Sequence, residues 1–324
     1  MRYAGLVRRR LLTRAFLRRG LPISLVALVL ALSSGLSQAK AQSRGKAAMA
    51  AGTTLRTDDL EVGRAAQLRS GAVLAQVALV PVKGKEQLQA VVTVMLKGQT
   101  VGVLRGLATP RSMQGAAVVQ IAELDSANVY PEVLLSAFTG GAHCCNQTQV
   151  LTRPLGQTTW QTVDLGPFDG GPMPARIPMG GDVPLVVSVD NRFLYKFACY
   201  ACGGAPPRLW QLQADRFVDV SHQRRYRPIF RQALQRLQAQ LQEPIQPNDN
   251  PNGWLAAYVA NMAMVGELQQ GWMQMLKRYS RQSDWGLKEC LGGYGKNGCK
   301  TPEVVYPTYP DALRAFLKRT GYWQ

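Results

Sequence analysis

The chain has 324 residues, six cysteines and a formal net charge of +18 at pH 7. That length is enough for one large domain or two modest ones. Beyond the N-terminal segment no stretch is apolar enough to cross a membrane as a helix. Nearly half of the positive charge lies at the N-terminus and the rest is thinly spread. Because we expect the chain to be exported, we do not expect a nucleic-acid partner.

Residues 1–41 have the three parts of a secretory signal peptide. Arginines without any acid come first, an apolar run extends from Leu21 to Leu32, and Ala39-Lys40-Ala41 is a small-x-small cleavage pattern. The run is shorter than the ~20 residues that span a bilayer, which disfavours an uncleaved anchor. Cleavage would remove eight cations and no acid, lowering the formal charge from +18 to +10. We expect a periplasmic or secreted protein that meets membrane only through this segment, before cleavage.

The following residues predict a leader and then a β domain. Residues 42–70 have little periodicity and predict a flexible leader. Residues 71–225 contain short β-type runs, such as Val73–Val82 and Leu88–Leu96, separated by turn signals. Because no helical pattern separates these runs, we expect antiparallel strands in a sandwich-like or propeller-like arrangement.

Residues 226–324 predict a helical C-terminal region, so the expected fold class is α+β. Apolar residues recur at intervals of 4, 3 and 4, at Phe230, Leu234, Leu237 and Leu241. This spacing places them along one face of a helix. Residues 243–253 are typical of a linker, Gly266 permits a turn between two further helices, and Thr308 and Asp311 have capping-box spacing at the start of the last.

All six cysteines lie beyond the predicted cleavage site, at Cys144, Cys145, Cys199, Cys202, Cys290 and Cys299. An even number in an exported chain favours disulfides. Bonds between the two earlier segments would staple neighbouring β units, and a bond between the last two cysteines would close a loop. Two alternatives stay open. His143 with the first four cysteines would suit a zinc or copper ion, and Cys199 with Cys202 would suit a thiol–disulfide couple.

The motif Gly140-Gly141-Ala142-His143-Cys144-Cys145 follows a predicted strand, and a weaker version of its surroundings includes Asp190-Asn191-Arg192-Phe193. The stretch from 117 to 220 resembles FG-GAP-like repeats, the blades of integrin-type propellers. It also resembles uncharacterised exported bacterial proteins with a Gly-Gly-Ala-His-Cys-Cys signature. The resemblance implies a fold and no activity. Such repeats bind calcium through an acidic loop, of which only Asp125 and Asn128 remain here, so we expect a plain turn.

No catalytic constellation stands out in the sequence. It has no G-x-S-x-G elbow, no H-E-x-x-H motif and no phosphate-binding P-loop. The G-x-G-x-x-G match at Gly293–Gly298 lacks the βαβ unit that a dinucleotide site requires. The spacing of the acidic residues does not single out a catalytic pair among Asp125, Glu132, Asp164, Asp169, Asp182 and Asp190. We therefore favour a non-catalytic protein without cofactor over the remaining alternative, a hydrolase whose catalytic acids the sequence does not identify.

The loops Phe138–Asn146 and Asn191–Pro207 form the candidate binding face. The side chains expected there are Phe138, Thr139, His143, Asn191, Arg192 and Tyr200. The expected partner is an acidic polymer of the cell envelope, because the chain stays basic after cleavage, or another protein. The leading hypothesis is a binding or structural protein of the envelope, and the alternative is a metal-binding or thiol-redox protein. Glycines and prolines that merely shape turns would produce the same pattern.

Overall fold

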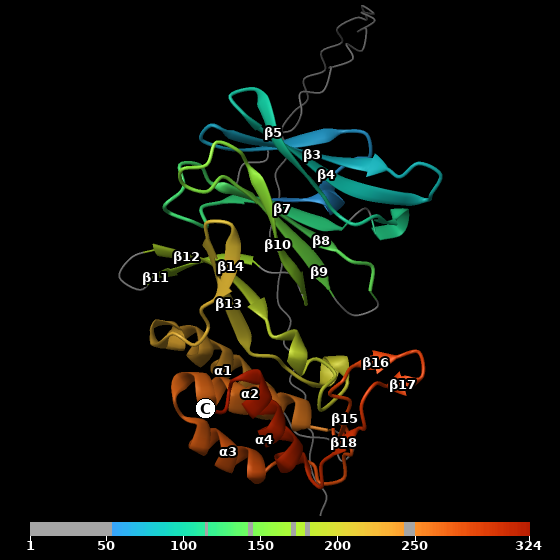
Figure 1. Ribbon diagram of the computed structural model, residues 1–324, viewed down its shortest axis with the longest axis vertical. Coiled ribbons are helices and arrows are strands. Elements are labelled where there is room, and N and C mark those ends of the chain that lie inside the picture. The colour runs from blue at the N-terminus through green and yellow to red at the C-terminus, as the bar shows by residue number, and fades with distance from the viewer. Residues whose placement is uncertain (1–53, 114–115, 142–144, 170–172, 179–181, 243–249) are drawn as a thin grey trace, which may run out of the picture. The chain divides into compact units, whose positions relative to one another are not determined.

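The structure is a computed structural model that describes residues 54–113, 116–141, 145–169, 173–178, 182–242 and 250–324. The predicted signal peptide, His143 and Cys144 lie outside these ranges. The described chain is antiparallel β structure followed by a helical region (Figure 1), so the α+β prediction is confirmed. Neither a closed barrel nor a propeller is present among the described strands, and the propeller-like alternative is unsupported.

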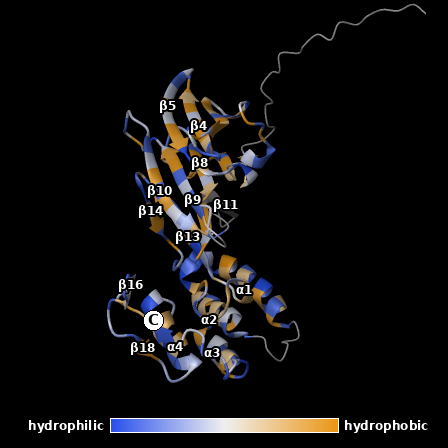
Figure 2. Cartoon of the chain, turned by 90° about the vertical axis from the view of Figure 1, so that its right-hand side faces the viewer, coloured by the Kyte–Doolittle hydropathy of each residue, from blue (hydrophilic) through white to orange (hydrophobic). Residues whose placement is uncertain are grey.

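Two antiparallel sheets come first. One contains β2 (Ala65–Ser70), β3 (Val73–Pro81), β4 (Gln87–Leu96) and β5 (Gln99–Arg105), with β6 (Thr109–Pro110) paired to β4. The other contains, in spatial order, β1 (Thr54–Arg56), β7 (Ala117–Ala122), β8 (Glu132–Phe138), β9 (Asn146–Thr152) and β10 (Gln161–Phe168). Hydrophobic and hydrophilic bands alternate along strands such as β4 and β5 (Figure 2), as expected of half-buried strands.

The two sheets share one hydrophobic core. Val77 and Val92 are partners across β3 and β4, and both are fully buried in the same cluster as Val119 of β7. Gly102 of β5 permits the close approach of the sheets, because a Cβ atom there would lie 2.6 Å from Cδ2 of Leu151 on β9. This packing is that of two sheets face to face rather than of propeller blades.

Residues 54–70 differ from the prediction of a flexible leader. In this segment β1 pairs with β7 and β2 pairs with β3, and both Leu55 and Leu68 are buried. A 3-10 turn at Thr57–Asp59 and Gly63, with a φ of 85°, separate the two strands. That interruption leaves each strand too short to show a clear period of two in the sequence.

A third antiparallel sheet lies next to the second. It contains β11 (Met173–Pro178), β12 (Asp182–Val189), β13 (Pro207–Gln213) and β14 (Arg216–Asp219). Leu134 and Val150 of the second sheet form a small apolar cluster with Val186 and Leu212 of the third. The second sheet is therefore covered on one face by the first sheet and on the other by the third. This explains why side chains on both faces of β8 and β9 are buried.

The helical region contains α1 (Arg227–Gln242), α2 (Asn252–Val265), α3 (Leu268–Leu276) and α4 (Tyr309–Thr320). The predicted stripe of α1 is buried, and Gly266 ends α2 in the left-handed conformation with a φ of 88°. The Thr308 hydroxyl accepts a hydrogen bond from the backbone N–H of Asp311, which confirms the predicted cap of α4. α2 begins at Asn252, within the segment predicted as a linker.

The region between α3 and α4 forms two short hairpins. β15 (Lys288–Glu289) pairs with β18 (Val304–Val305), and β16 (Tyr294–Gly295) pairs with β17 (Gly298–Cys299). A disulfide joins Cys290 to Cys299 and closes the second hairpin. Within the described part of the chain, none of the helices combines the length and apolar character needed to cross a bilayer.

One hydrophobic core contains residues of the helices and of the third sheet. Leu185 of β12 and Leu209 of β13 belong to the same buried cluster as Phe230 of α1, Val259 of α2 and Leu313 of α4. The predicted boundary between a β domain ending at 225 and a helical region starting at 226 remains a prediction. The two parts share apolar contacts across it.

Candidate binding site

The structure brings the two predicted loops together. The side-chain amide of Asn191 lies 3.6 Å from Sγ of Cys145 and donates to the carbonyl of Pro167 at 3.1 Å. Its Oδ1 accepts from the backbone N–H of Asp169 at 3.1 Å. Thr139 closes the first loop, since its hydroxyl accepts from the Cys145 N–H at 3.1 Å. Asn191 therefore connects both loops and the end of β10.

Two tyrosines flank this contact. The rings of Tyr195 and Tyr200 lie 5.6 Å apart, and the Tyr200 hydroxyl donates to Oδ1 of Asp169. That hydrogen bond raises the pKa of Tyr200 to about 12. We call Cys145, Asp169, Asn191, Tyr195 and Tyr200 the loop face. It joins residues that are separated by up to 55 positions in the sequence.

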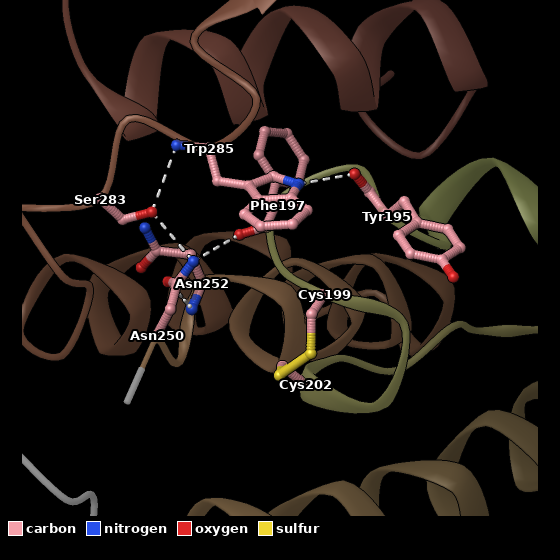
Figure 3. The surroundings of a disulfide bond; sticks show 8 residues. All are labelled: Tyr195, Phe197, Cys199, Cys202, Asn250, Asn252, Ser283 and Trp285. Carbon is pink, nitrogen blue, oxygen red and sulfur yellow. Dashed lines mark hydrogen bonds between the residues drawn. A yellow bond between two sulfur atoms is a disulfide. The ribbon is translucent and has the colours of Figure 1, made fainter. Parts of the chain in front are cut away.

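Tyr195 has a left-handed backbone with a φ of 58°, although its side chain is large. This conformation costs free energy for a residue other than glycine and persists only where surrounding contacts hold it. The indole N–H of Trp285 donates to the Tyr195 carbonyl at 2.8 Å, and the Tyr195 ring points away from that indole (Figure 3). Tyr195 is 46% exposed. The ring is therefore presented to solvent by a fixed backbone.

Two asparagines that the sequence assigned to a linker hold distant segments together, and Asn250 bonds to the loop that carries Tyr195 (Figure 3). Nδ2 of Asn250 donates to the Phe197 carbonyl and to Oγ of Ser283, each at 2.9 Å. Fully buried Asn252 exchanges two hydrogen bonds with the backbone of Ser280. Asparagine between prolines is a turn signal, and nothing in that local pattern reveals partners about 30 to 50 residues away.

The cysteines pair differently from the predicted staple between β units. Cys199 is bonded to Cys202, only three residues away, and not to the segment around Cys145. A Cβ atom at Gly203 would lie 3.1 Å from Cα of Gly253, so the disulfide loop packs tightly against the start of α2. Cys145 is also disulfide-bonded.

These bonds argue against the metal-binding alternative. Zinc and copper are held by thiolates, and the sulfurs of Cys145, Cys199 and Cys202 are all in disulfides. Among the described residues, no three histidine, cysteine or acidic side chains gather to hold an ion. The Cys199–Cys202 bond is the oxidised form of the couple that the thiol-redox alternative names. Cys199 precedes a three-residue 3-10 turn, however, and not an α-helix whose N-terminus would stabilise a thiolate.

Arg192, expected on the binding face, is committed to the fold. Its guanidinium contacts the fully buried carboxylate of Asp190 through Nε at 2.8 Å and Nη2 at 2.5 Å. This hydrogen bonding raises the pKa of Arg192. The Tyr322 hydroxyl donates to the same carboxylate at 3.0 Å, and Nη2 also donates to the Thr320 carbonyl at 3.3 Å. Arg192 thus ties the second loop to the C-terminus.

Phe138 pairs with Asn146, the residue after Cys145, and lines a cavity of about 380 Å³ together with Arg56, Asp58 and Val118. Of the six expected face residues, the structure gathers Thr139, Asn191 and Tyr200 at one place. His143 lies outside the described residues. Tyr195 was missed, because a tyrosine in the left-handed conformation has no sequence signal.

The loop that departs from the calcium pattern is satisfied internally. The fully buried carboxylate of Glu132 accepts from the Leu124 N–H at 2.7 Å, from Nδ2 of Asn128 at 2.6 Å and from the Thr152 hydroxyl at 3.0 Å. Burial raises the pKa of Glu132, and these hydrogen bonds oppose that effect. The carboxylate thus has protein donors where a calcium-binding loop would direct its oxygens at an ion.

Replacing Glu132 with glutamine is expected to remove one pH dependence of stability. A carboxyl whose pKa is raised on folding binds its proton more tightly in the native state. Its stabilising contribution is therefore complete below the unfolded pKa of about 4.3 and is lost as the pH rises through the higher folded pKa. Urea unfolding from about pH 3.5 to 7 measures this, and Glu86→Gln, at an exposed side chain, is the control. Equal pH profiles for Glu132→Gln and wild type would contradict the assignment.

Comparisons with known proteins identify relatives. The family model described as the sll0997 C-terminal domain matches residues 230–321, from α1 to the end of α4. The probable thylakoid lumen protein sll0997 of a Synechocystis species is 44% identical over 239 residues, which cover 74% of this chain and 69% of that protein. The uncharacterized protein y4bJ of Sinorhizobium fredii is 32% identical over 208 residues, which cover 64% of this chain and 32% of that protein.

No solved structure matches the chain. Neither the family description nor the two relatives' names refers to FG-GAP repeats, so that resemblance gains no support from them. The match to sll0997 extends well beyond the C-terminal domain, because 239 aligned residues exceed the 92 positions from 230 to 321. With this identity over most of both chains, the protein belongs to the sll0997 family.

Proposed function

We propose that the chain is a non-catalytic, exported binding protein that engages a protein partner through the loop face. Export is supported by the disulfides Cys199–Cys202 and Cys290–Cys299, because such bonds persist in oxidising compartments. It is also supported by the name of the Synechocystis relative, a probable thylakoid lumen protein. A periplasmic or secreted location in the cell envelope is consistent with both.

The exposed ring of Tyr195 is the observation that carries the binding proposal. A tyrosine held at the surface by a strained backbone and by Trp285 loses little conformational entropy when it meets a partner. Exposed tyrosine and tryptophan are enriched at the energetic centres of protein interfaces. Tyr200 and Asn191 add polar groups beside the ring, as interfaces also require.

The charges around the loop face favour a protein over an acidic polymer. Arg192 is paired with Asp190, and Lys196 forms an ion pair with Glu289 at 2.8 Å in which both side chains are only 15% exposed. These two cations, the nearest in the sequence to Asn191 and Tyr195, are thus neutralised within the fold, while Asp169 adds an acid to the face. A polyanion is bound by clustered, uncommitted cations, so a protein surface fits this face better.

Site-specific photocrosslinking tests the proposal. A photoreactive phenylalanine analogue at Tyr195, in the exporting cell, is expected to give a discrete protein adduct. The same analogue at Leu155, which is 67% exposed elsewhere, is the control and should not give that adduct. The identified partner should then bind Tyr195→Ala about tenfold or more weakly than wild type.

Three results would contradict the proposal. Identical adducts from Tyr195 and Leu155 would show chance collisions. Unchanged affinity of Tyr195→Ala would remove the tyrosine from the interface. A polysaccharide adduct would identify a polymer ligand in place of a protein.

A further inference from the structure

A second candidate site lies on the family domain, and none of its lining residues belongs to the loop face. α2 contacts both α1 and α3 (Figure 1), and together the three helices enclose an open groove of about 400 Å³. Four glutamines line it, Gln238 and Gln242 of α1 and Gln270 and Gln274 of α3. Among the residues that the structure describes, none hydrogen-bonds to these four side-chain amides. The groove therefore presents four uncommitted amide groups.

The four glutamines form two rows of two, one along α1 and one along α3. Each pair is separated by four positions, which places its members on one face of a helix about 6 Å apart along the axis. Alternate residues of an extended polypeptide repeat at about 6.6 Å. Each side-chain amide has two donor hydrogens and a carbonyl acceptor, as a main-chain peptide group has both a donor and an acceptor. The rows thus match the repeat and the chemistry of an extended main chain.

The floor of the groove is apolar and firm. Leu241 and Leu255 line it and are 5% and 1% exposed, and Tyr258, also in the lining, is 8% exposed. Arg278 donates to the Leu241 carbonyl and so ties the end of α1 to the residues after α3. In an extended peptide alternate side chains point to one side, so every second residue would face this floor. The groove is therefore formed by the fold before any ligand arrives.

We propose that this groove binds an extended peptide segment of another protein, whose main-chain amides hydrogen-bond to Gln238, Gln242, Gln270 and Gln274. This mode gives affinity through the main chain and selects apolar residues at alternate positions. The groove shares no residue with the loop face and would bind its ligand through different chemistry. This second proposal therefore does not depend on the proposed function. An oligosaccharide, which also bonds to amides, is the competing ligand class.

The experiment selects octapeptides from a random phage-displayed library on the immobilised full-length chain. The variant is Gln238→Leu/Gln270→Leu, and the matched control is Gln235→Leu/Gln269→Leu, exposed positions on the same two helices outside the groove lining. Equal melting temperatures of the two variants check that each is folded. Selected peptides are expected to have apolar residues at alternate positions. They should bind the groove variant about tenfold more weakly than wild type, and the control variant as wild type does.

A second measurement isolates the main-chain contacts. N-methylation of alternate residues in a selected peptide removes amide donors without changing its side chains, and should weaken binding about tenfold or more. Absence of selected peptides, or equal binding to the groove and control variants, would overturn the proposal. Binding of chitin or maltose oligosaccharides that is lost in the groove variant, without peptide binding, would assign the groove to sugars.

Discussion

Replacing Phe197 with alanine is expected to lower the free energy of unfolding by about 3–5 kcal/mol, the usual cost of emptying a buried phenylalanine site. Phe197 is 1% exposed, and its ring packs edge-on against Tyr309 at 5.1 Å and Phe316 at 5.5 Å. These partners are on α4, so the ring anchors the loop that carries Tyr195 to the helical core. A cavity there would remove both aromatic contacts at once.

Denaturant unfolding measures this effect. Phe197→Leu keeps most of the volume and should cost less than about 1.5 kcal/mol, and Tyr294→Ala, at a side chain 70% exposed, should stay within about 0.5 kcal/mol of wild type. An unchanged m value would show that the variants unfold from equally compact native states. A loss below about 1 kcal/mol for Phe197→Ala would mean that the site collapses around the gap.

The helical region could largely be predicted from the sequence, because local rules determine it. The stripe from Phe230 to Leu241, the left-handed Gly266 and the Thr308 cap each depend on residues within about four positions. All three are present in the structure. The β runs were recognised for a similar reason, since the alternation in β3 and β4 is long and uninterrupted.

What escaped prediction depends on partners distant in sequence. Asn250 and Asn252 were interpreted as linker residues, and their hydrogen bonds to Phe197 and Ser280 cross 53 and 28 positions. The cysteine pairing depends on which loops approach one another, and six cysteines permit many pairings. The role of Arg192 was missed for the same reason. Apart from Asp190, its hydrogen-bond partner lies near the C-terminus, far away in the sequence. Composition and periodicity contain no information on such contacts.

Asn191 is the instructive exception at the candidate site. The pattern Asp190-Asn191-Arg192 placed it on the binding face, and the structure gives it the bridging role between the two loops. An amide has donors and an acceptor, so one asparagine can hydrogen-bond to backbone groups at the end of β10 and contact the Cys145 sulfur at once. The same pattern placed Arg192 there too, yet its guanidinium turns to the buried Asp190. Residue type could not separate the two roles.

Replacing Arg192 with glutamine is expected to destabilise the protein by about 2–3 kcal/mol. The change leaves the fully buried Asp190 carboxylate with the Tyr322 hydroxyl and one backbone N–H as donors. Removing one partner of a buried ion pair costs about 3–5 kcal/mol. The Arg192 side chain is 43% exposed, so water screens part of the interaction and the lower value applies.

Unfolding in urea, with a double-mutant cycle, measures this prediction. Arg192→Lys keeps the charge and loses the two-pronged contact, so an intermediate loss is expected. Arg64→Gln breaks a pair with Glu61 whose side chains are 64% and 72% exposed, and should change stability by less than about 1 kcal/mol. In an Asp190→Asn background the Arg192→Gln loss should shrink, since no buried charge is stranded. An undiminished loss there would assign the effect of Arg192 to its bond with the Thr320 carbonyl instead.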